Sequence, residues 1–294
     1  MFAALLALAL TAAPDAGPEP VVELVKGGRT TRQSRVILGT KVTVAIADPP
    51  RAELANHQLH FDAAFVPFLA MEVALSDSRD DAVVPAIQAA NKAPVAAGLE
   101  LCNLVALALE TARKSKGTYE PTAPCGSWKE LDLRAVKMPS PACTLRLKKP
   151  GITLQLAPLA LASGVDRAVK VLRNLGYVNF MVQAGSDQYF AGGVGDRGWK
   201  MTVRDPKGAD DKSFARGEVT ETAVSTRGAI ATCRPSKKAA FVTALAPTTV
   251  EAMLLAEATL TRGFDEKLKL LVVEADGTVK ANAELKAQLD LTPH

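Results

Sequence analysis

Histidines and aromatic residues are scarce in this sequence, and basic residues never gather into a long block. The chain of 294 residues has 3 histidines, and Phe, Trp and Tyr make up 5% of it. Lys and Arg total 35 against 31 Asp and Glu, and these charges are scattered along the chain. Nucleic-acid-binding proteins usually combine a basic surface with aromatic side chains that stack on bases. The sequence therefore argues against nucleic acid as a partner.

Cysteine pairs with metal-binding spacing are also missing. The cysteines are Cys102, Cys125, Cys143 and Cys233, and no two of them form a Cys-x-x-Cys motif. The sequence therefore gives no support to a zinc site or to thioredoxin-like chemistry. Cys102 shares one face of a helical pattern with apolar residues, which predicts a buried thiol. Cys125 and Cys143 have loop-like and strand-edge surroundings, so they are the predicted disulfide pair if the protein is exported.

A short apolar run stands at the N-terminus. It covers Phe2–Ala13 and is followed by a Pro-rich stretch. Such a run is too short to span a bilayer and is typical of the core of a signal peptide. No Lys or Arg precedes it, so a buried N-terminal helix is the alternative. We predict a signal peptide and linker at residues 1–20, and an exported protein that is periplasmic or associated with the outer side of a membrane. No other segment is expected to cross a membrane.

The rest of the chain predicts an α+β protein. Its hydrophobic content of 48% can supply a sizeable core for one large domain or two interlocked ones. Helical and strand patterns are segregated rather than strictly alternating. The expected helices are Arg51–Leu75 with a kink or break at Pro67, Asp81–Lys92, Val95–Lys114, one that begins at Ser163 and Asp166 and ends at Gly176, and Thr248–Thr261. The expected strands include Arg35–Asp48 with an interruption at Gly39, Cys143–Leu147, Ile152–Leu156 and a hairpin at Asp276-Gly277.

The stretch VQAGSDQYFAGG, from Val182 to Gly193, has two interpretations. Its glycines can let backbone N–H groups approach a phosphate, or they can supply the positive φ angles of a tight hairpin. Strand patterns flank the turn at Val178–Val182 and Gln188–Phe190, and no long helix follows. This arrangement argues against a Rossmann or P-loop site and favours the hairpin.

Several stretches, taken in order, resemble the FAD:protein FMN transferase (ApbE-like) family. The similar stretches are ILGTKVTVAI (Ile37–Ile46), SKGTYEPT (Ser115–Thr122), SGVDRAVKVLRNLGYVNFMVQAGSD (Ser163–Asp187) and AVSTRG (Ala223–Gly228). The resemblance covers nearly the whole chain after Val36. It implies a T-fold-like arrangement of mixed sheets with packed helices, in one domain of residues 30–294.

The resemblance also implies a chemistry and a ligand. In the family, a Ser or Thr hydroxyl of a partner protein attacks the pyrophosphate of FAD, which leaves FMN esterified to the partner and releases AMP. Such phosphoryl transfer needs a cation, and Mg²⁺ prefers hard oxygen ligands. The resemblance implies that the turn at Gln183–Asp187 lines the FAD cleft as well as connecting two strands. A plain hairpin turn and a turn that also lines the cleft both stay open as interpretations. The positions that the resemblance assigns to cofactor binding are Tyr119, Glu120, Thr122, Gly185, Asp187, Thr226 and Gly228.

The sequence departs from the family pattern where the metal is expected. The family's late helix carries Asp and, four residues later, Thr, and these positions are Met253 and Glu257 here. A thioether is a poor ligand for Mg²⁺. Glu257 could supply one oxygen, but we expect a solvated helix residue. Arg227 replaces a serine and could meet a phosphate, although we expect it to be exposed.

Other family positions are changed as well. A Lys and an aromatic residue before the central helix become Leu161 and Ser163, and Ser163 is expected to be a helix N-cap. The interval Ala229–Ala240 is too short for the family's His-containing loop. His57 and His60 fall on an amphipathic helix, where a surface or packing role is expected.

These departures predict a degenerate, non-catalytic relative that binds flavin or a protein partner, with no catalytic residue and no metal ligand assigned. One alternative is an active transferase with a rebuilt Mg²⁺ site that uses Glu257. Another is a structural or interaction protein with a closed cleft. A flavoprotein acceptor is the partner that the resemblance implies.

Overall fold

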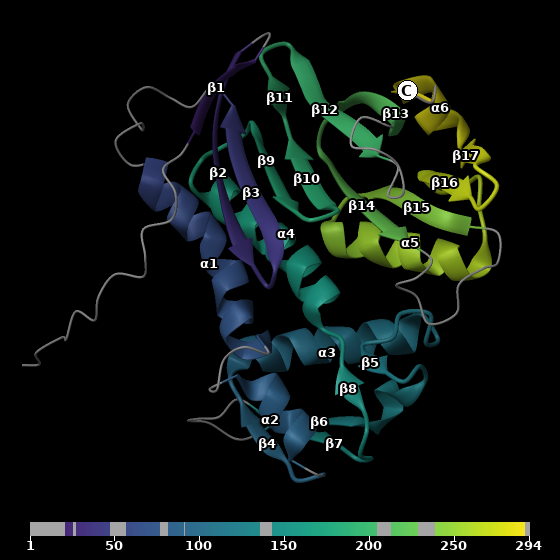
Figure 1. Cartoon of the computed structure of the whole chain (residues 1–294). Helices are drawn as coiled ribbons and strands as arrows, with labels where there is room; N and C mark the ends of the chain where they lie inside the picture. The colour runs from purple at the N-terminus through teal and green to yellow at the C-terminus, as the bar shows by residue number, and fades with distance from the viewer. Residues whose placement is uncertain are drawn as a thin grey trace, which may run out of the picture.

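A nine-stranded sheet, in which every neighbouring pair of strands is antiparallel, runs through the upper part of the structure (Figure 1). The computed structural model describes residues 21–25, 28–47, 57–76, 82–90, 92–135, 143–204, 213–228 and 239–291. The strand order is β1-β2-β3-β9-β10-β14-β15-β16-β17. The signal peptide predicted for residues 1–20 lies outside the described residues.

The mixture of helices and antiparallel sheets confirms the α+β prediction. The helices are α1 (His57–Leu75), α2 (Val83–Ala89), α3 (Leu99–Lys114), α4 (Ala157–Asn174), α5 (Thr249–Arg262), α6 (Ala283–Gln288) and the 3₁₀ turn η2 (Ser127–Glu130). The strands are β1 (Val21–Val25), β2 (Gly28–Ile37), β3 (Thr40–Ala47), β4 (Val95–Ala97), β5 (Thr122–Ala123), β6 (Leu131–Ala135), β7 (Cys143–Leu147), β8 (Thr153–Leu154), β9 (Phe180–Ala184), β10 (Asp187–Ala191), β11 (Gly193–Val194), β12 (Arg197–Arg204), β13 (Ser213–Val219), β14 (Thr222–Gly228), β15 (Ala239–Ala246), β16 (Leu270–Glu274), β17 (Val279–Ala281) and β18 (Leu289–Asp290).

Helices α4 and α5 cover one face of the large sheet, and α1 packs on α4. Phe61, Phe65 and Phe68 of α1 are fully buried in the core that these helices form with the sheet. Gly164 of α4 allows the two helices to approach closely, because a Cβ at this position would lie 2.5 Å from the ring of Phe68. The close contact holds α4, and the residues that it carries, in a fixed place against the sheet.

Helix α1 corrects one sequence expectation. It continues through Pro67 without interruption from His57 to Leu75, so the predicted break is wrong. Among the described residues it is the helix long and apolar enough to cross a membrane by length and composition, with a mean hydropathy of 1.2 over Gln58–Leu75. Because Phe61, Phe65 and Phe68 are fully buried against α4 and the sheet, we describe α1 as a core helix.

A second, smaller sheet packs on the opposite face of the large one. Its order is β11-β12-β13-β18, and Trp199 and Met201 of β12 join a core with Phe190 of β10 and Phe241 of β15. Trp199 Nε1 donates to the carbonyl oxygen of Ala191 at 2.8 Å, which fixes β12 against the end of β10.

The lower part of Figure 1 contains α2, α3 and two small sheets. Here Cys102 of α3 forms a disulfide with Cys143 of β7, with their Cα atoms 6.0 Å apart. The predicted Cys125–Cys143 pair and the predicted free thiol at Cys102 are therefore wrong. Cys143 pairs in register with Ala97 of β4, and α3 begins at Leu99, two residues after Ala97. The first turn of α3 therefore brings Cys102 next to Cys143. Cys125 is also disulfide-bonded, to a cysteine other than Cys143.

The stretch VQAGSDQYFAGG forms a hairpin between β9 and β10. Ala184 pairs with Asp187, so Gly185 and Ser186 make a two-residue turn. Gly185 takes a φ of +59°, whereas Ser186 is not among the residues with positive φ. A serine is therefore compatible with this turn, and the hairpin interpretation is confirmed.

Candidate functional site

A buried ion pair lies where β10 and β14 meet the helices. Arg227 Nη2 donates to Asp187 Oδ2 at 2.8 Å, and Ser225 Oγ donates to Asp187 Oδ1 at 2.7 Å. The side chains of Arg227 and Asp187 are 9% and 3% exposed. Both carboxylate oxygens of Asp187 are thus engaged by neighbours on β14.

The guanidinium of Arg227 is held on several sides. Its Nη1 donates to Ser186 Oγ at 2.9 Å and to the carbonyl oxygen of Thr226 at 3.0 Å. Its Nε has no hydrogen-bond partner among the described residues. The expectation that Arg227 is exposed is wrong, because β14 is covered by α5 on one face and by the small sheet on the other.

Glu257 of α5 lies beside the same guanidinium. Its Oε1 is 3.9 Å from Arg227 Nε, and its side chain is 14% exposed. Burial raises the pKa of Glu257 to about 7, with Arg227 opposing this shift and Asp187 adding to it. The expectation of a solvated helix residue is therefore wrong, since the side chain points inward at the ion pair.

Tyr119 approaches the same cluster from the loop before β5. It is 4% exposed, and its hydroxyl has no hydrogen-bond partner among the described residues. Burial raises the pKa of Tyr119, and the negative charge of Glu257 raises it further. The neighbouring Glu120 turns into its own loop, where it accepts from Thr122 N at 3.2 Å and from Gly126 N at 2.5 Å. The loop with Tyr119, Glu120 and Thr122 is therefore internally fixed.

The predicted cofactor-binding residues of the large sheet fall on its two faces, whereas Tyr119, Glu120 and Thr122 lie in β5 and the loop before it. Asp187 faces the helices with Arg227, and Tyr119 interacts electrostatically with Arg227 and Glu257. Thr226, one residue before Arg227, faces the small sheet because successive strand residues alternate. Thr226 and Gly185 line a cleft of about 620 Å³ beside β12, and neither Tyr119 nor Asp187 lines it. Gly228 ends β14. The binding roles of these residues stay predictions.

Asp166 positions the N-terminus of α5. Its carboxylate accepts from Thr249 N at 2.6 Å and from Val250 N at 3.0 Å, which satisfies two free N–H groups of that helix. Burial raises the pKa of Asp166, against the lowering effect of these hydrogen bonds. The predicted N-cap at Ser163 is wrong, because α4 begins six residues earlier at Ala157 with Pro158 in its first turn.

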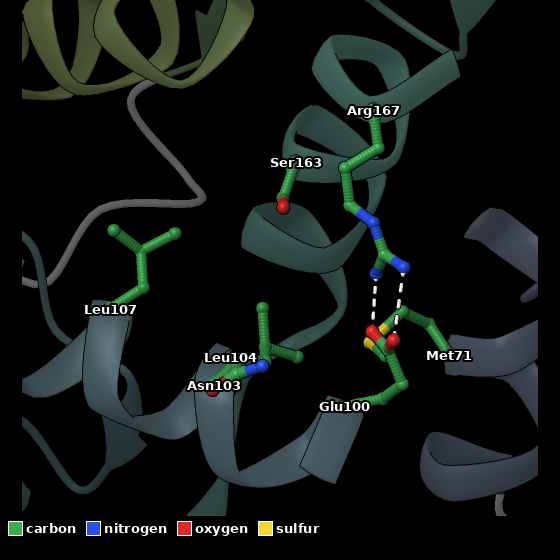
Figure 2. A pocket seen from close by; sticks show the side chains of 7 residues that line it. All are labelled: Met71, Glu100, Asn103, Leu104, Leu107, Ser163 and Arg167. Atoms are coloured by element: carbon green, nitrogen blue, oxygen red, sulfur yellow. Dashed lines mark hydrogen bonds and ion pairs between the residues drawn. The ribbon is translucent and has the colours of Figure 1, made fainter. Parts of the chain in front are cut away.

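Ser163 instead faces a cavity of about 280 Å³ between α3 and α4. In Figure 2, Ser163 and Arg167 descend from α4 toward α3, and Arg167 meets Glu100 through a pair of hydrogen bonds. These bonds measure 2.5 and 3.1 Å. The pairing joins residues 67 positions apart, and the sequence carried no local signal for it. The cavity is lined by Met71, Glu100, Asn103, Leu104, Leu107, Ser163 and Arg167.

The residues at the expected metal position do not fit Mg²⁺ as they are arranged. Met253 is fully buried in an apolar cluster, and Glu257 lies beside the guanidinium of Arg227, with its Oε1 3.9 Å from Nε. Within the described part of the chain, no group of three or more His, Cys, Asp or Glu residues could hold a metal ion. His60 has a packing role, with Nδ1 2.7 Å from Tyr177 Oη, while the side chain of His57 and all of His294 lie outside the described residues.

Sequence comparison matches residues 38–233 to the ApbE family. The chain belongs to the ApbE family. No curated protein is significantly similar in sequence. Among solved structures, the ApbE protein of Thermotoga maritima superposes with a TM-score of 0.70 at 19% identity, covering 88% of this chain and 99% of its own. The flavin transferase ApbE of Vibrio cholerae gives 0.70 at 17% identity, covering 89% and 99%. The flavinyl transferase ApbE of Pseudomonas stutzeri, in its apo form, gives 0.66 at 14%, covering 91% and 100%. These similarities establish the ApbE fold.

Proposed function

We propose that this chain is an ApbE-family protein that binds a flavin nucleotide but does not transfer FMN. The observation that carries the proposal is the buried pair of Arg227 and Asp187. Arg227 Nε also lies 3.9 Å from Glu257 Oε1, and Glu257 stands at one of the two metal positions of the family pattern, so a side chain of the same protein supplies the positive charge there. Cleavage of the FAD pyrophosphate would have to proceed without the divalent cation on which such transfer depends.

Two further features support the absence of transfer. Met253 places a thioether in the apolar core at a position where the family pattern has a carboxylate, and Leu161 stands where it has a lysine. Groups that act together in catalysis leave little activity when several of them are lost. The combined changes therefore favour a binding role over a catalytic one.

The cavity between α3 and α4 is the place where we propose that the isoalloxazine ring of the flavin binds, because its volume of about 280 Å³ suits a ring system and not a whole dinucleotide. Ser163 stands where the family pattern has an aromatic residue, and its small side chain leaves room beside Leu104 and Leu107 (Figure 2). Small-molecule sites combine apolar walls with fixed polar groups, and four of the seven residues that line this cavity are polar. Here the polar groups are the Ser163 hydroxyl, the Asn103 amide and the ion pair of Arg167 with Glu100.

The burial of Glu257 favours one alternative, an active transferase with a rebuilt metal site. Glu257 and Asp187 both face Arg227, so a movement of Arg227 would leave two carboxylates facing each other. In that case FAD binding and FMN transfer would both depend on Mg²⁺.

We also propose that the protein works outside the cytoplasm. The disulfide between Cys102 and Cys143 supports this, because structural disulfides persist in oxidising compartments and are rare in the cytosol. An apolar run at Phe2–Ala13 is in keeping with export.

Isothermal titration of the full chain with FAD, with and without Mg²⁺, tests the binding proposal. We expect the same affinity in both conditions. The variant Leu107→Trp fills the cavity and is expected to weaken binding at least about tenfold, while the control Lys170→Trp, on an exposed position of α4, leaves it unchanged. Binding that requires Mg²⁺ would favour the rebuilt metal site, and no binding of FAD would contradict the proposal.

A further inference from the structure

Arg227 lies close to carboxylates that belong to different elements. Asp187 of β10 contacts Nη2 at 2.8 Å, and Glu257 of α5 lies 3.9 Å from Nε. Each of the three side chains is at most 14% exposed. A single guanidinium thus connects a sheet strand to the helix that covers it.

No other basic side chain forms an ion pair with Asp187 or Glu257 among the described residues. Buried carboxylates need compensation, because removing one partner of a buried pair leaves an uncompensated charge in a low-dielectric interior. Arg227 therefore supplies the positive charge of this cluster.

The way in which Arg227 is fixed differs from the way a metal ion would be held. Its planar guanidinium donates to a hydroxyl, a carbonyl and a carboxylate at once, on Ser186, Thr226 and Asp187. Arginine also keeps its charge at any pH at which the protein is folded. A divalent cation would require several oxygen ligands in near-octahedral geometry, and it could exchange with solvent.

We infer that Arg227 is a built-in cation that takes the place of a divalent metal between Asp187 and Glu257. The inference rests on the proposed function in one respect, namely that the site works without a metal. It adds that the carboxylates are kept from divalent ions by Arg227 itself. Removal of that side chain should therefore create a site for a divalent ion.

Titration with Mn²⁺, followed by electron paramagnetic resonance of the free ion, tests the inference without flavin. The measurement is made at about pH 8, above the wild-type pKa of Glu257 of about 7. In Arg227→Ser the bound Mn²⁺ ion would supply the positive charge that keeps Glu257 ionised. We expect no bound Mn²⁺ at this cluster in the wild type and a new site in Arg227→Ser, at least about tenfold tighter than any wild-type binding. The new site should disappear in Arg227→Ser combined with Asp187→Asn. The control Arg173→Ser, which removes an arginine from a half-exposed pair with Glu221, should gain no site.

Thermal unfolding of the same proteins gives a second readout. Arg227→Ser should unfold roughly 5–15 °C below the wild type without Mn²⁺ and regain part of this loss when Mn²⁺ is added. Arg227→Lys should stay indifferent to Mn²⁺. If Arg227→Ser does not fold, the variant Arg227→Met with Asp187→Asn and Glu257→Gln, which removes all three charges, should fold. Its failure to fold would contradict the role as a counter-ion.

The inference is overturned if Arg227→Ser binds no more Mn²⁺ than the wild type, or if the wild type binds an Mn²⁺ ion that Asp187→Asn removes. The proposed function can fail separately. Transfer of FMN by the wild type would refute that function, whereas an inactive wild type whose Arg227→Ser variant gains no site would refute only the inference.

Discussion

Arg227 donates to Asp187 at 2.8 Å across neighbouring strands, and both side chains are almost fully buried. Asp187 is the first residue of β10 and pairs in register with Ser225 of β14. Arg227 stands two residues after Ser225 on the same strand, and its side chain reaches back to Asp187. The hydroxyl of Ser225 holds the other carboxylate oxygen. The cluster therefore joins the end of the β9–β10 hairpin to β14 and to α5.

Breaking this ion pair should be costly. We expect Arg227→Met and Asp187→Asn each to lower the free energy of unfolding by about 3–5 kcal/mol, because each leaves an unpaired buried charge. The double variant should lose clearly less than the sum of the two. Urea unfolding of the four proteins of this cycle measures the coupling.

The pair of Arg173 with Glu221 provides the control for that cycle. Its side chains are 50% and 56% exposed, and exposed pairs contribute about 0–1 kcal/mol. Additive effects at Arg227 and Asp187, as small as those at the control pair, would contradict a buried ionic cluster.

Glu257 should make stability depend on pH. Its pKa in the folded protein is raised to about 7, so the folded state binds the proton more tightly than the unfolded state does. The protonated group favours folding most below about pH 4.5, and this contribution is lost as pH rises toward 7, by up to about 3 kcal/mol.

Unfolding curves of the wild type and of Glu257→Gln over this pH range check the prediction. The variant should lose less stability between about pH 5 and 7 than the wild type does. Glu251→Gln, at an exposed position of the same helix, serves as control and should follow the wild type. Parallel curves for the wild type and Glu257→Gln would show that Glu257 does not titrate in this range.

The hairpin at Gly185-Ser186 and the helix at Thr249–Arg262 could be predicted from sequence because their signals are local. Arg227 could not be placed in the same way. Both faces of β14 are covered, because its buried residues include Ala223, Val224, Ser225 and Arg227. The strand therefore lacks the alternation of apolar and polar residues that would mark one buried face. The Asp187 side chain that neutralises Arg227 comes from a strand 40 residues earlier.

The sequence predicts the wrong start for α4 because two local signals compete. Ser163 and Asp166 have the spacing of a helix start, but Pro158 in the first turn is the signal that the structure follows. Asp166 does cap a helix, although it caps α5 and not its own. A contact of this kind depends on tertiary packing and leaves no mark in the local sequence.

The disulfide between Cys102 and Cys143 should contribute substantially to stability. The two cysteines are 41 residues apart in sequence, and in the chain-entropy model a loop of this size gives about 4 kcal/mol. Cys102→Ser combined with Cys143→Ser should therefore unfold at a lower urea concentration than the wild type. Peptide mapping under non-reducing conditions should recover the two cysteines in one linked peptide, and recovery of Cys143 linked to Cys125 would contradict the structure.

Gly164 should tolerate no side chain. A Cβ there would lie 2.5 Å from the Phe68 ring, so Gly164→Ala must push α1 away from α4 and should lower the free energy of unfolding by about 1–3 kcal/mol. At Gly228 a Cβ would meet nothing within 4 Å, and Gly228→Ala should change stability by less than about 0.5 kcal/mol. Equal effects at the two positions would mean that the helices are not in close contact.

Covalent FMN transfer is the measurement that tests the central claim most directly. The purified chain is incubated with FAD, Mg²⁺ and an acceptor domain that an active flavin transferase labels, and the denatured acceptor is examined for flavin fluorescence while AMP release is followed. We predict no labelling and no AMP above background, with the active enzyme labelling the same acceptor in parallel. Stoichiometric labelling by this chain, lost in Glu257→Gln, would contradict the account and establish a rebuilt catalytic site.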